Sequence, residues 1–348
     1  LPGGGSYGLS LPAQTGAEAM GVGTTRTLFT GMRPGETSIL GFYTPGGATA
    51  TTQLIASDGT LRASRPLTLE SNVSAEYNPA SSFFGVSSAP GDVIRVTVTA
   101  GLLQPYVNIQ DPVTRDVALS LPVAATTDAV IPNVGSVPSG GTLWTSGLQL
   151  SNPDATHTAS VSASYYPLGG GTPIAMALTL PPASSASFGD VVAELFDAAP
   201  GQGAIVLTSD APIATSQRLS AQNVSNGSQF ACQSAALDGA ASVPDGGATA
   251  LDVYGSSSRR TNLLLFNRGA AGTATVTAYN GAGAAVGQLL VPMAAGEAAR
   301  ISRVFEAVGA ASTPFGRVRV EPSAGMRLYA QSVNVDPVTA DTDLSALR

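Results

Sequence analysis

The sequence predicts an all-β protein made of three tandem antiparallel β-sandwich modules, preceded by an extended N-terminal arm. Three observations predict this fold: a composition typical of strands and turns, alternation of apolar and polar residues, and an internal repeat of about 110 residues. At 348 residues the chain has room for two or three domains of ordinary size.

The composition favours short strands joined by turns, and it argues against nucleic acid as a partner and against a transmembrane segment. Hydrophobic residues make up 43% of the chain, and charged residues only 11%, less than half the usual share of about 25%. The chain has 40 glycines and 24 prolines, and all 16 basic residues are arginine at a net charge of −7. The sequence therefore lacks the basic patches that would neutralise phosphate, which argues against binding to nucleic acid. No apolar run reaches the ~18 residues of a transmembrane helix.

Three stretches that begin at Thr37, Thr145 and Thr261 carry the repeat: TSILGFYTPGGATATTQLIASDG, TSGLQLSNPDATHTASVSASYYPLGGG and TNLLLFNRGAAGTATVTAYNGAG. Each predicts a short apolar strand, a turn with Pro or Gly, and a strand in which apolar and polar residues alternate. The residues expected in the core of these strands are Ile39, Leu40, Phe42, Leu148, Leu150, Leu264 and Phe266.

The downstream part of each repeat carries an aromatic residue, Phe84, Phe196 or Phe305. These three are expected to fill the same core position in each module. The stretches FGDVVAELFD and ISRVFEAVG are expected to be single helical turns that cross from one sheet to the other. Each repeat then predicts a strand, a turn and a second strand.

The first and third modules end in nearly the same sequence motif. The pattern DPVT-x-D-x-x-LS begins at Asp111 and again at Asp336, and the second module has SAQNVSNGSQFACQ in its place. The predicted boundaries are an arm over 1–20 and modules over 21–125, 126–238 and 239–348. The connecting stretches are too apolar for flexible linkers, so the modules are expected to dock on one another.

The layout resembles tandem Ig-like modules of secreted proteins from GC-rich bacteria. The resemblance is carried by VIPNVGSVPSGGTLWTSGLQLSNP, SFGDVVAELF and GAIVLTSDAPIATSQR, and it is best in the second module. The first module departs from the pattern, with GFYTP where the pattern has Asn-Pro. The resemblance implies three Ig-like sandwiches, an extracellular or cell-surface location after removal of a signal peptide, and a building-block or binding role. It brings no catalytic residue.

Few residues could carry chemistry, so the sequence predicts a protein that is not an enzyme and has no cofactor. The only histidine, His157, lies in an expected exposed hairpin turn, and the single cysteine, Cys232, fits a small buried hydrophobe. The weak calcium candidates are four aspartates that recur in pairs: Asp111, Asp116, Asp336 and Asp341. Asp-Pro turns explain the same pattern, and we favour the turn.

The candidates for contact with a ligand or partner are aromatic and apolar residues. Trp144 stands where the other modules have Glu36 and Arg260, so it is either a plug at a module junction, which we favour, or a contact for sugar or protein. Tyr165 and Tyr166 are adjacent in a strand, so one is expected to face outward and could stack on a sugar. In the arm, Tyr7, Leu9 and Leu11 belong to a stretch that could pair with a sheet edge of a neighbouring copy or fold back on its own module.

These observations favour a non-enzymatic extracellular structural protein that self-associates through sheet edges and its arm into a filament, sheath or layer. The alternative is an adhesin or carbohydrate-binding module, with glycans as partners.

Overall fold

The structure is a computed structural model that describes residues 19–139, 141–225, 229–336 and 342–347. Within these ranges the protein is all-β, with antiparallel pairing throughout its sheets and three helices of four residues each. The predicted fold class, all-β with antiparallel sheets, is therefore confirmed. Residues 1–18, which make up most of the predicted arm, lie outside the described residues. None of the described helices has the length and apolar character needed to cross a membrane.

The first eight strands, which we call the first segment, form two antiparallel four-stranded sheets with the orders β1-β6-β3-β4 and β5-β2-β7-β8. Alternation decides which faces are buried: in β7 every second residue of QPYVNIQ is buried. The strands are β1 (Thr25–Phe29), β2 (Thr37–Thr44), β3 (Ala48–Ile55), β4 (Leu61–Leu69), β5 (Val73–Tyr77), β6 (Val93–Gly101), β7 (Gln104–Gln110) and β8 (Val117–Ser120).

The last eight strands, the third segment, repeat the same order as β17-β22-β19-β20 and β21-β18-β23-β24. Two strands break the alternation: every residue of β18 after the first and all eight residues of β23 are buried, as in strands covered on both faces. The strands are β17 (Ala248–Tyr254), β18 (Arg260–Asn267), β19 (Gly272–Asn280), β20 (Ala285–Met293), β21 (Glu297–Ile301), β22 (Phe315–Pro322), β23 (Leu328–Val335) and β24 (Thr342–Ala346).

The middle strands, the second segment, have the same neighbours joined into one eight-stranded sheet. The first part of the long strand β14 pairs with β9 and β11, and its second part pairs with β10 and β15. The strands are β9 (Thr126–Ser139), β10 (Thr142–Ser151), β11 (Ala159–Pro167), β12 (Ile174–Leu180), β13 (Ser185–Phe188), β14 (Gly201–Asn223), β15 (Gln229–Ala235) and β16 (Leu237–Asp238).

The long strand β14 corrects one expectation from the sequence. A turn was predicted between two strands near Pro212, but β14 runs through this position as one strand of 23 residues. Its pairing with β9 shifts register between Thr208 and Ile213. Because proline has no N–H to donate, it is tolerated in a sheet at such an irregularity, and the chain bends there without leaving the strand.

A helical turn stands between the fifth and sixth strands of each segment. These helices are α1 (Ser81–Phe84), α2 (Val191–Glu194) and α3 (Val304–Ala307). In the third segment the fifth and sixth strands belong to different sheets, as predicted for ISRVFEAVG. The first segment shows the same crossing, which was not predicted, whereas in the second segment β13 and β14 belong to one sheet, so the crossing predicted for FGDVVAELFD is not seen. Phe84, Phe196 and Phe305 are all buried in the hydrophobic clusters of their segments, as predicted.

Each segment has its own hydrophobic cluster, and all of the predicted core residues are buried. Leu264 and Phe266 nevertheless face away from the third segment's cluster, which is filled instead by their neighbours Leu263 and Leu265. Successive side chains of a strand point to opposite faces. Leu264 and Phe266 therefore occupy the second face of β18, which packs against the second segment.

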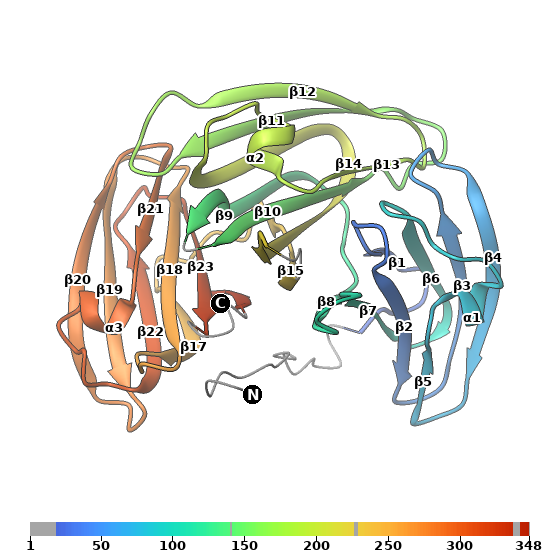
Figure 1. Ribbon diagram of the computed structural model, residues 1–348, viewed down its shortest axis with the longest axis horizontal. Helices are drawn as coiled ribbons and strands as arrows, with labels where there is room; N and C mark the ends of the chain where they lie inside the picture. Colours follow the sequence, from blue (N-terminus) through green and yellow to red (C-terminus); the bar gives the residue numbers. More distant parts are fainter. Residues whose placement is uncertain (1–18, 140, 226–228, 337–341, 348) are drawn as a thin grey trace.

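The three segments form an arch, with the second segment between the other two (Figure 1). Inside the arch, β15 contacts both β8 and β24. These are the last long strands of the three repeats, so the closing parts of the repeats meet at the centre of the molecule.

Candidate functional site

The three aromatic candidates in the second segment are packed against protein to different degrees. Tyr165 is 3% exposed, and its ring centroid lies 5.6 Å from that of Phe196 in the core. Tyr166 is half-buried, with its ring centroid 5.0 Å from that of Phe266 in the third segment. Trp144 is half-buried against an apolar cluster that the second and third segments share. The two tyrosines thus form no exposed platform, and a role for these residues in ligand contact stays a prediction.

The other predicted contact residues belong to the arm. Tyr7, Leu9 and Leu11 lie outside the described residues. Their donation to a neighbouring copy therefore remains a prediction.

Two of the calcium candidates are occupied by hydrogen bonds from the protein. Asp111 Oδ1 accepts from the backbone N–H of Val113 at 2.9 Å and of Thr114 at 2.8 Å, as in an Asp-Pro turn. Asp116 Oδ2 accepts from the backbone N–H of Ala231 in β15 at 3.0 Å. Burial raises the pKa of Asp116, and hydrogen bonds from the backbone of Ala231 and Val117 oppose the rise.

The second pair of calcium candidates gives no site either. Asp336 is buried, and Asp341 lies outside the described residues. In the described ranges, no three His, Cys, Asp or Glu side chains come together in a way that could hold a metal ion. His157 is exposed, and its Nδ1 lies 3.2 Å from Oδ2 of Asp154 in the same turn.

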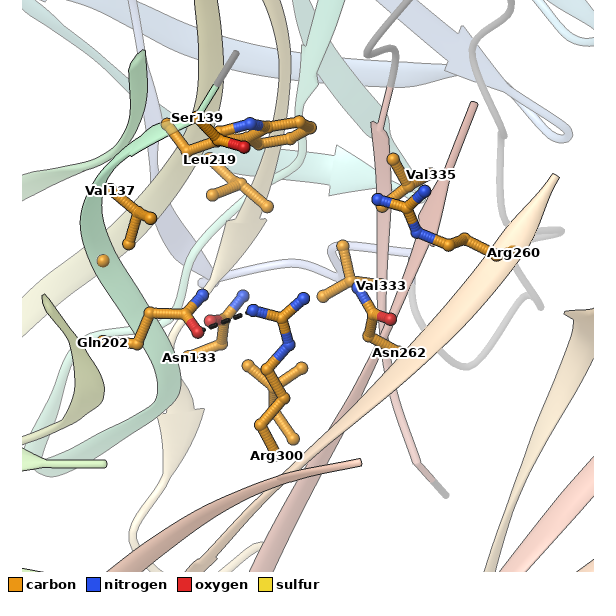
Figure 2. Close-up of a pocket in the computed structure, with 13 residues that line it drawn as sticks. Asn133, Val137, Ser139, Gln202, Leu219, Arg260, Asn262, Arg300, Val333 and Val335 are labelled. Carbon is orange, nitrogen blue, oxygen red and sulfur yellow. Dashed lines mark hydrogen bonds between the residues drawn. The ribbon is translucent and has the colours of Figure 1, made fainter. Parts of the chain in front are cut away.

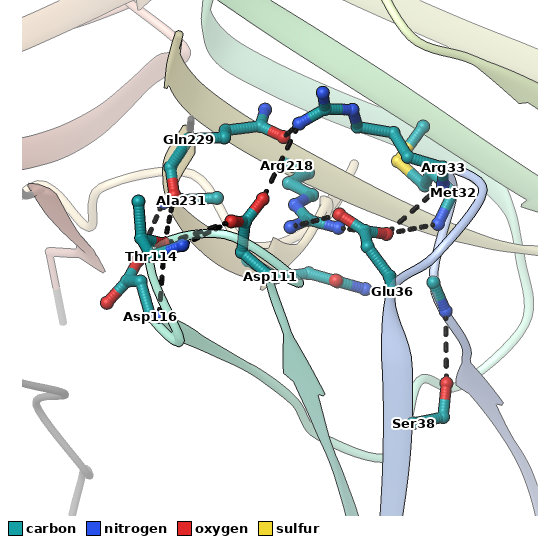
Figure 3. Close-up of polar contacts among 12 residues, drawn as sticks. Met32, Arg33, Glu36, Ser38, Asp111, Thr114, Asp116, Arg218, Gln229 and Ala231 are labelled. Atoms are coloured by element: carbon teal, nitrogen blue, oxygen red, sulfur yellow. Dashed lines mark hydrogen bonds and ion pairs between the residues drawn. The ribbon is translucent and has the colours of Figure 1, made fainter. Parts of the chain in front are cut away.

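A buried ion pair joins the first segment to the second (Figure 3). Arg218 Nη1 donates to Glu36 Oε2 at 2.9 Å, and Nη2 lies 2.8 Å from Oε1 without hydrogen-bond alignment. The Glu36 side chain is 0% exposed and that of Arg218 is 4% exposed. Oε2 also accepts from the backbone N–H groups of Met32 and Arg33. We call this pair and its loop the first junction.

The turn that begins with Asp111 extends the first junction to β15. Thr114 Oγ1 donates to the backbone carbonyl of Gln229 at 2.9 Å, and Arg33 donates to the Gln229 side chain. Arg33 also lies 3.7 Å from Asp111. The repeated DPVT segment of the first repeat therefore serves as a docking loop between segments.

The second and third segments meet in a second junction of apolar and charged contacts. Phe266 and Tyr329 pack against Val130 of β9. Arg268 binds Asp128 with Nη1 at 2.6 and 2.7 Å from the two carboxylate oxygens. The Tyr329 hydroxyl donates to the backbone carbonyl of Gly239. Burial raises the pKa of Tyr329, which the cationic Arg327 and Arg268 partly offset.

Beside the second junction lies a cleft of about 150 Å³, with walls from both segments (Figure 2). Strand alternation builds it, because every second residue of a strand faces the same side. From the second segment it is lined by Asn133, Gly135, Val137, Ser139, Trp144, Gln202 and Leu219. From the third segment it is lined by Arg260, Asn262, Leu264, Arg300, Val333 and Val335.

The charge of the cleft comes from two arginines of the third segment. Arg300 Nη1 donates to the Gln202 side chain at 2.7 Å. Burial lowers the pKa of Arg300, and the neighbouring Arg260 lowers it further. Burial also lowers the pKa of Arg260, as does Arg303, while Glu306 opposes the change. Among the described residues neither Arg260 nor Arg300 forms an ion pair with a carboxylate, so the cleft is positively charged.

Comparisons with known proteins give no family. No family model and no curated protein matches the sequence. Among solved structures, a Bacteroides uniformis β-glucuronidase 2 is similar over 61% of this chain and 25% of its own, at 11% identity and a TM-score of 0.15. Dimeric latent PorU from Porphyromonas gingivalis is similar over 90% of this chain and 29% of its own, at 13% identity and a TM-score of 0.16. The chain thus spans less than a third of those proteins, and likeness at this level carries no argument about fold or function.

Sequence reasoning missed the residues that form the junctions and the charged part of the cleft. A signal was present, because the aligned positions Glu36, Trp144 and Arg260 differ among the repeats. All three lie at or near the start of the second strand of a segment, and each lies at a junction or in the cleft. A position that varies among repeats of one fold marks a contact that only one repeat makes.

Proposed function

We propose that this protein is a non-enzymatic extracellular structural protein, a self-associating subunit of a surface filament, sheath or layer. We also propose that its three segments are tandem Ig-like sandwich modules, a view supported by the strand order that recurs in them. The extracellular location rests on the sequence resemblance.

The observation that carries self-association is a row of free sheet edges. Strands β4, β12 and β20 each end their sheets, and they lie along the outer side of the arch (Figure 1). Such edges present unpaired N–H and C=O groups that pair with another chain unless charge or proline prevents it. β4 carries Arg62, Arg65 and Pro66, and β20 carries Pro292, whereas β12 reads IAMALTL without either.

The central strand β12 is therefore the best edge for pairing with a second copy. Ala175, Met176 and Ala177 are exposed along it, so a partner strand would meet small or flexible apolar side chains. Pairing of β12 with itself gives a closed two-fold dimer, and a polymer needs a second, head-to-tail contact. We assign that second contact to the N-terminal arm.

Electron microscopy with negative stain, together with mass photometry over a dilution series, tests this function. We expect ordered filaments or sheets, and Ala177→Lys is expected to shift the mass distribution toward the 34.7 kDa monomer because lysine protects an edge strand. Ser64→Lys places the same charge on the protected edge β4 and serves as the matched control. A monodisperse monomer at every dilution would contradict the proposal.

A second function, binding of a sugar, is favoured by one observation: Trp144 lines a cleft that also carries amide and guanidinium groups. An aromatic ring offers an apolar face to a sugar ring, and amides supply hydrogen bonds. A glycan array tests it, with Trp144→Ala expected to abolish any signal. An array on which no sugar binds would exclude this second function and leave self-association untouched.

A further inference from the structure

Two arginines bring like charges together in the cleft between the second and third segments, without a carboxylate to balance them among the described residues. A buried charge normally has a partner, because removing it from water is unfavourable. Arg260 is half-buried and Arg300 is exposed at the cleft, the two guanidinium groups repel one another, and neither forms an ion pair with a carboxylate among the described residues. Unfavourable arrangements of this kind concentrate at binding sites, where a ligand supplies the missing charge.

The surrounding groups are arranged to keep the guanidiniums available. Arg300 is steered by Gln202 Oε1, a neutral acceptor that orients the guanidinium without neutralising it. Asn262 Oδ1 accepts from the backbone N–H of Arg303 at 3.0 Å. That bond holds the Asn262 side chain while its amide NH₂ donates to no protein group among the described residues. In Figure 2 the Arg300 guanidinium points toward Gln202 and Asn133.

We propose that this cleft binds the anionic group of an acidic glycan, a carboxylate or sulfate on a sugar ring that is held by Arg260 and Arg300 and stacks on Trp144. The proposal deepens the second function above, and rests on it, by naming the class of sugar. Guanidinium groups bind planar carboxylates and sulfates through paired charge-assisted hydrogen bonds. A neutral sugar would leave both guanidinium groups without a counter-charge.

The size of the cleft sets the length of ligand that it holds. Its volume of about 150 Å³ is well below the roughly 300 Å³ at which pockets for drug-sized ligands begin. It therefore accommodates one sugar unit, with the rest of the glycan in solvent. The two segments that form the walls are fixed by the Arg268–Asp128 ion pair, so the site is preformed and a ligand orders no loop.

Isothermal titration calorimetry with a matched ligand pair tests the proposal. The probes are a tetragalacturonate and its fully methyl-esterified form, which has the same sugar rings without charge, followed by a sulfated oligosaccharide such as a carrageenan tetrasaccharide. We expect at least one acidic probe to bind, the ester to bind at least tenfold more weakly, and the affinity to fall with added salt. Arg300→Gln and Arg260→Gln are each expected to weaken binding at least tenfold.

Two controls keep the result specific. Arg317→Gln removes the same charge from an exposed position on β22 and is expected to leave binding unchanged. The melting temperature of Arg300→Gln is expected to equal or exceed that of the wild type, because a like-charge repulsion is removed. A merely structural role for Arg300 would lower it.

Each outcome is decisive. Equal binding of the ester and the acid would overturn the acidic ligand while leaving sugar binding intact. Binding of neither probe class, or binding that is unaffected by Arg300→Gln, would overturn the proposal. Binding of short peptides through their terminal carboxylate in preference to the acidic sugars would overturn the assignment to glycans.

Discussion

Removal of Arg218 tests whether the first junction stabilises the arch. Arg218→Met replaces the guanidinium by an apolar chain of similar length and leaves the carboxylate of Glu36 without its counter-charge. That carboxylate is 0% exposed, so water cannot take over the role of the lost cation. It keeps only the two backbone N–H donors of Met32 and Arg33.

The magnitude follows from the burial of both partners. Breaking a buried ion pair by removal of one member costs about 3–5 kcal/mol, whereas replacing both members by apolar groups is often neutral or favourable. We expect Arg218→Met to reduce the free energy of unfolding by about 3 kcal/mol. The double variant Glu36→Met/Arg218→Met should recover part of this loss, but not all of it, because the N–H groups of Met32 and Arg33 lose their acceptor.

Urea denaturation followed by circular dichroism and by fluorescence measures these changes, and a double-mutant cycle gives the coupling energy. The pair Arg303–Glu306 is the matched control, because its side chains are 48% and 47% exposed. An exposed pair of this kind is worth about 0.3–0.5 kcal/mol, so Arg303→Met should have a small effect. A loss below about 1 kcal/mol in Arg218→Met, or equal losses in the two variants, would refute the reasoning.

Two further predictions concern the centre of the arch. Burial raises the pKa of Asp116, so its ionised form opposes folding: the stability that this group contributes is complete below the unfolded pKa and is lost as pH rises through the folded pKa. Asp116→Asn keeps an acceptor for the Ala231 N–H and should therefore have a higher melting temperature than the wild type at pH 7. This difference in melting temperature should shrink toward about pH 4. A constant or reversed difference would contradict the prediction. Cys232 is 6% exposed, and its Sγ lies 3.4 Å from Thr342 Oγ1 in β24. A thiol reagent should therefore label it at the rate at which the arch opens. Labelling should be faster in Arg218→Met. Rapid stoichiometric labelling of the native protein would count against a closed centre.

Much of the strand content and of the core could be read from local patterns. The alternation in VIRVTVT and the turn residues between strands predict an all-β chain, because side chains of period two must face one side of a sheet. The recurring Phe84, Phe196 and Phe305 were recognised as core residues because an aromatic at a repeated position has the same neighbours in each copy. Local sequence did not show that β14 would continue through Pro212, since the pairing partners of that strand are distant in the chain.

The candidate site was beyond what local patterns could predict. Trp144 was placed at a junction or ligand contact, but the two arginines that share the cleft with it come from the third segment, more than a hundred residues away in sequence. The run LLLF at 263–266 held a signal that was not used. Four successive apolar residues in a strand indicate burial on both faces, so the second face of β18 needs a partner. What could not be read was which segment supplies it.

The sequence by itself determined the all-β class, the repeat, the helical turns of the second and third segments and most of the predicted core residues, because these depend on periodicity and on neighbours within one repeat. Only the tertiary structure decided that Glu36 pairs with Arg218, that Phe266 packs against the second segment, and that Arg260 and Arg300 are left without a carboxylate. The physical reason is that junctions depend on how three similar bodies are placed, and a charge pair or an apolar contact between them leaves no periodic trace in either partner's sequence.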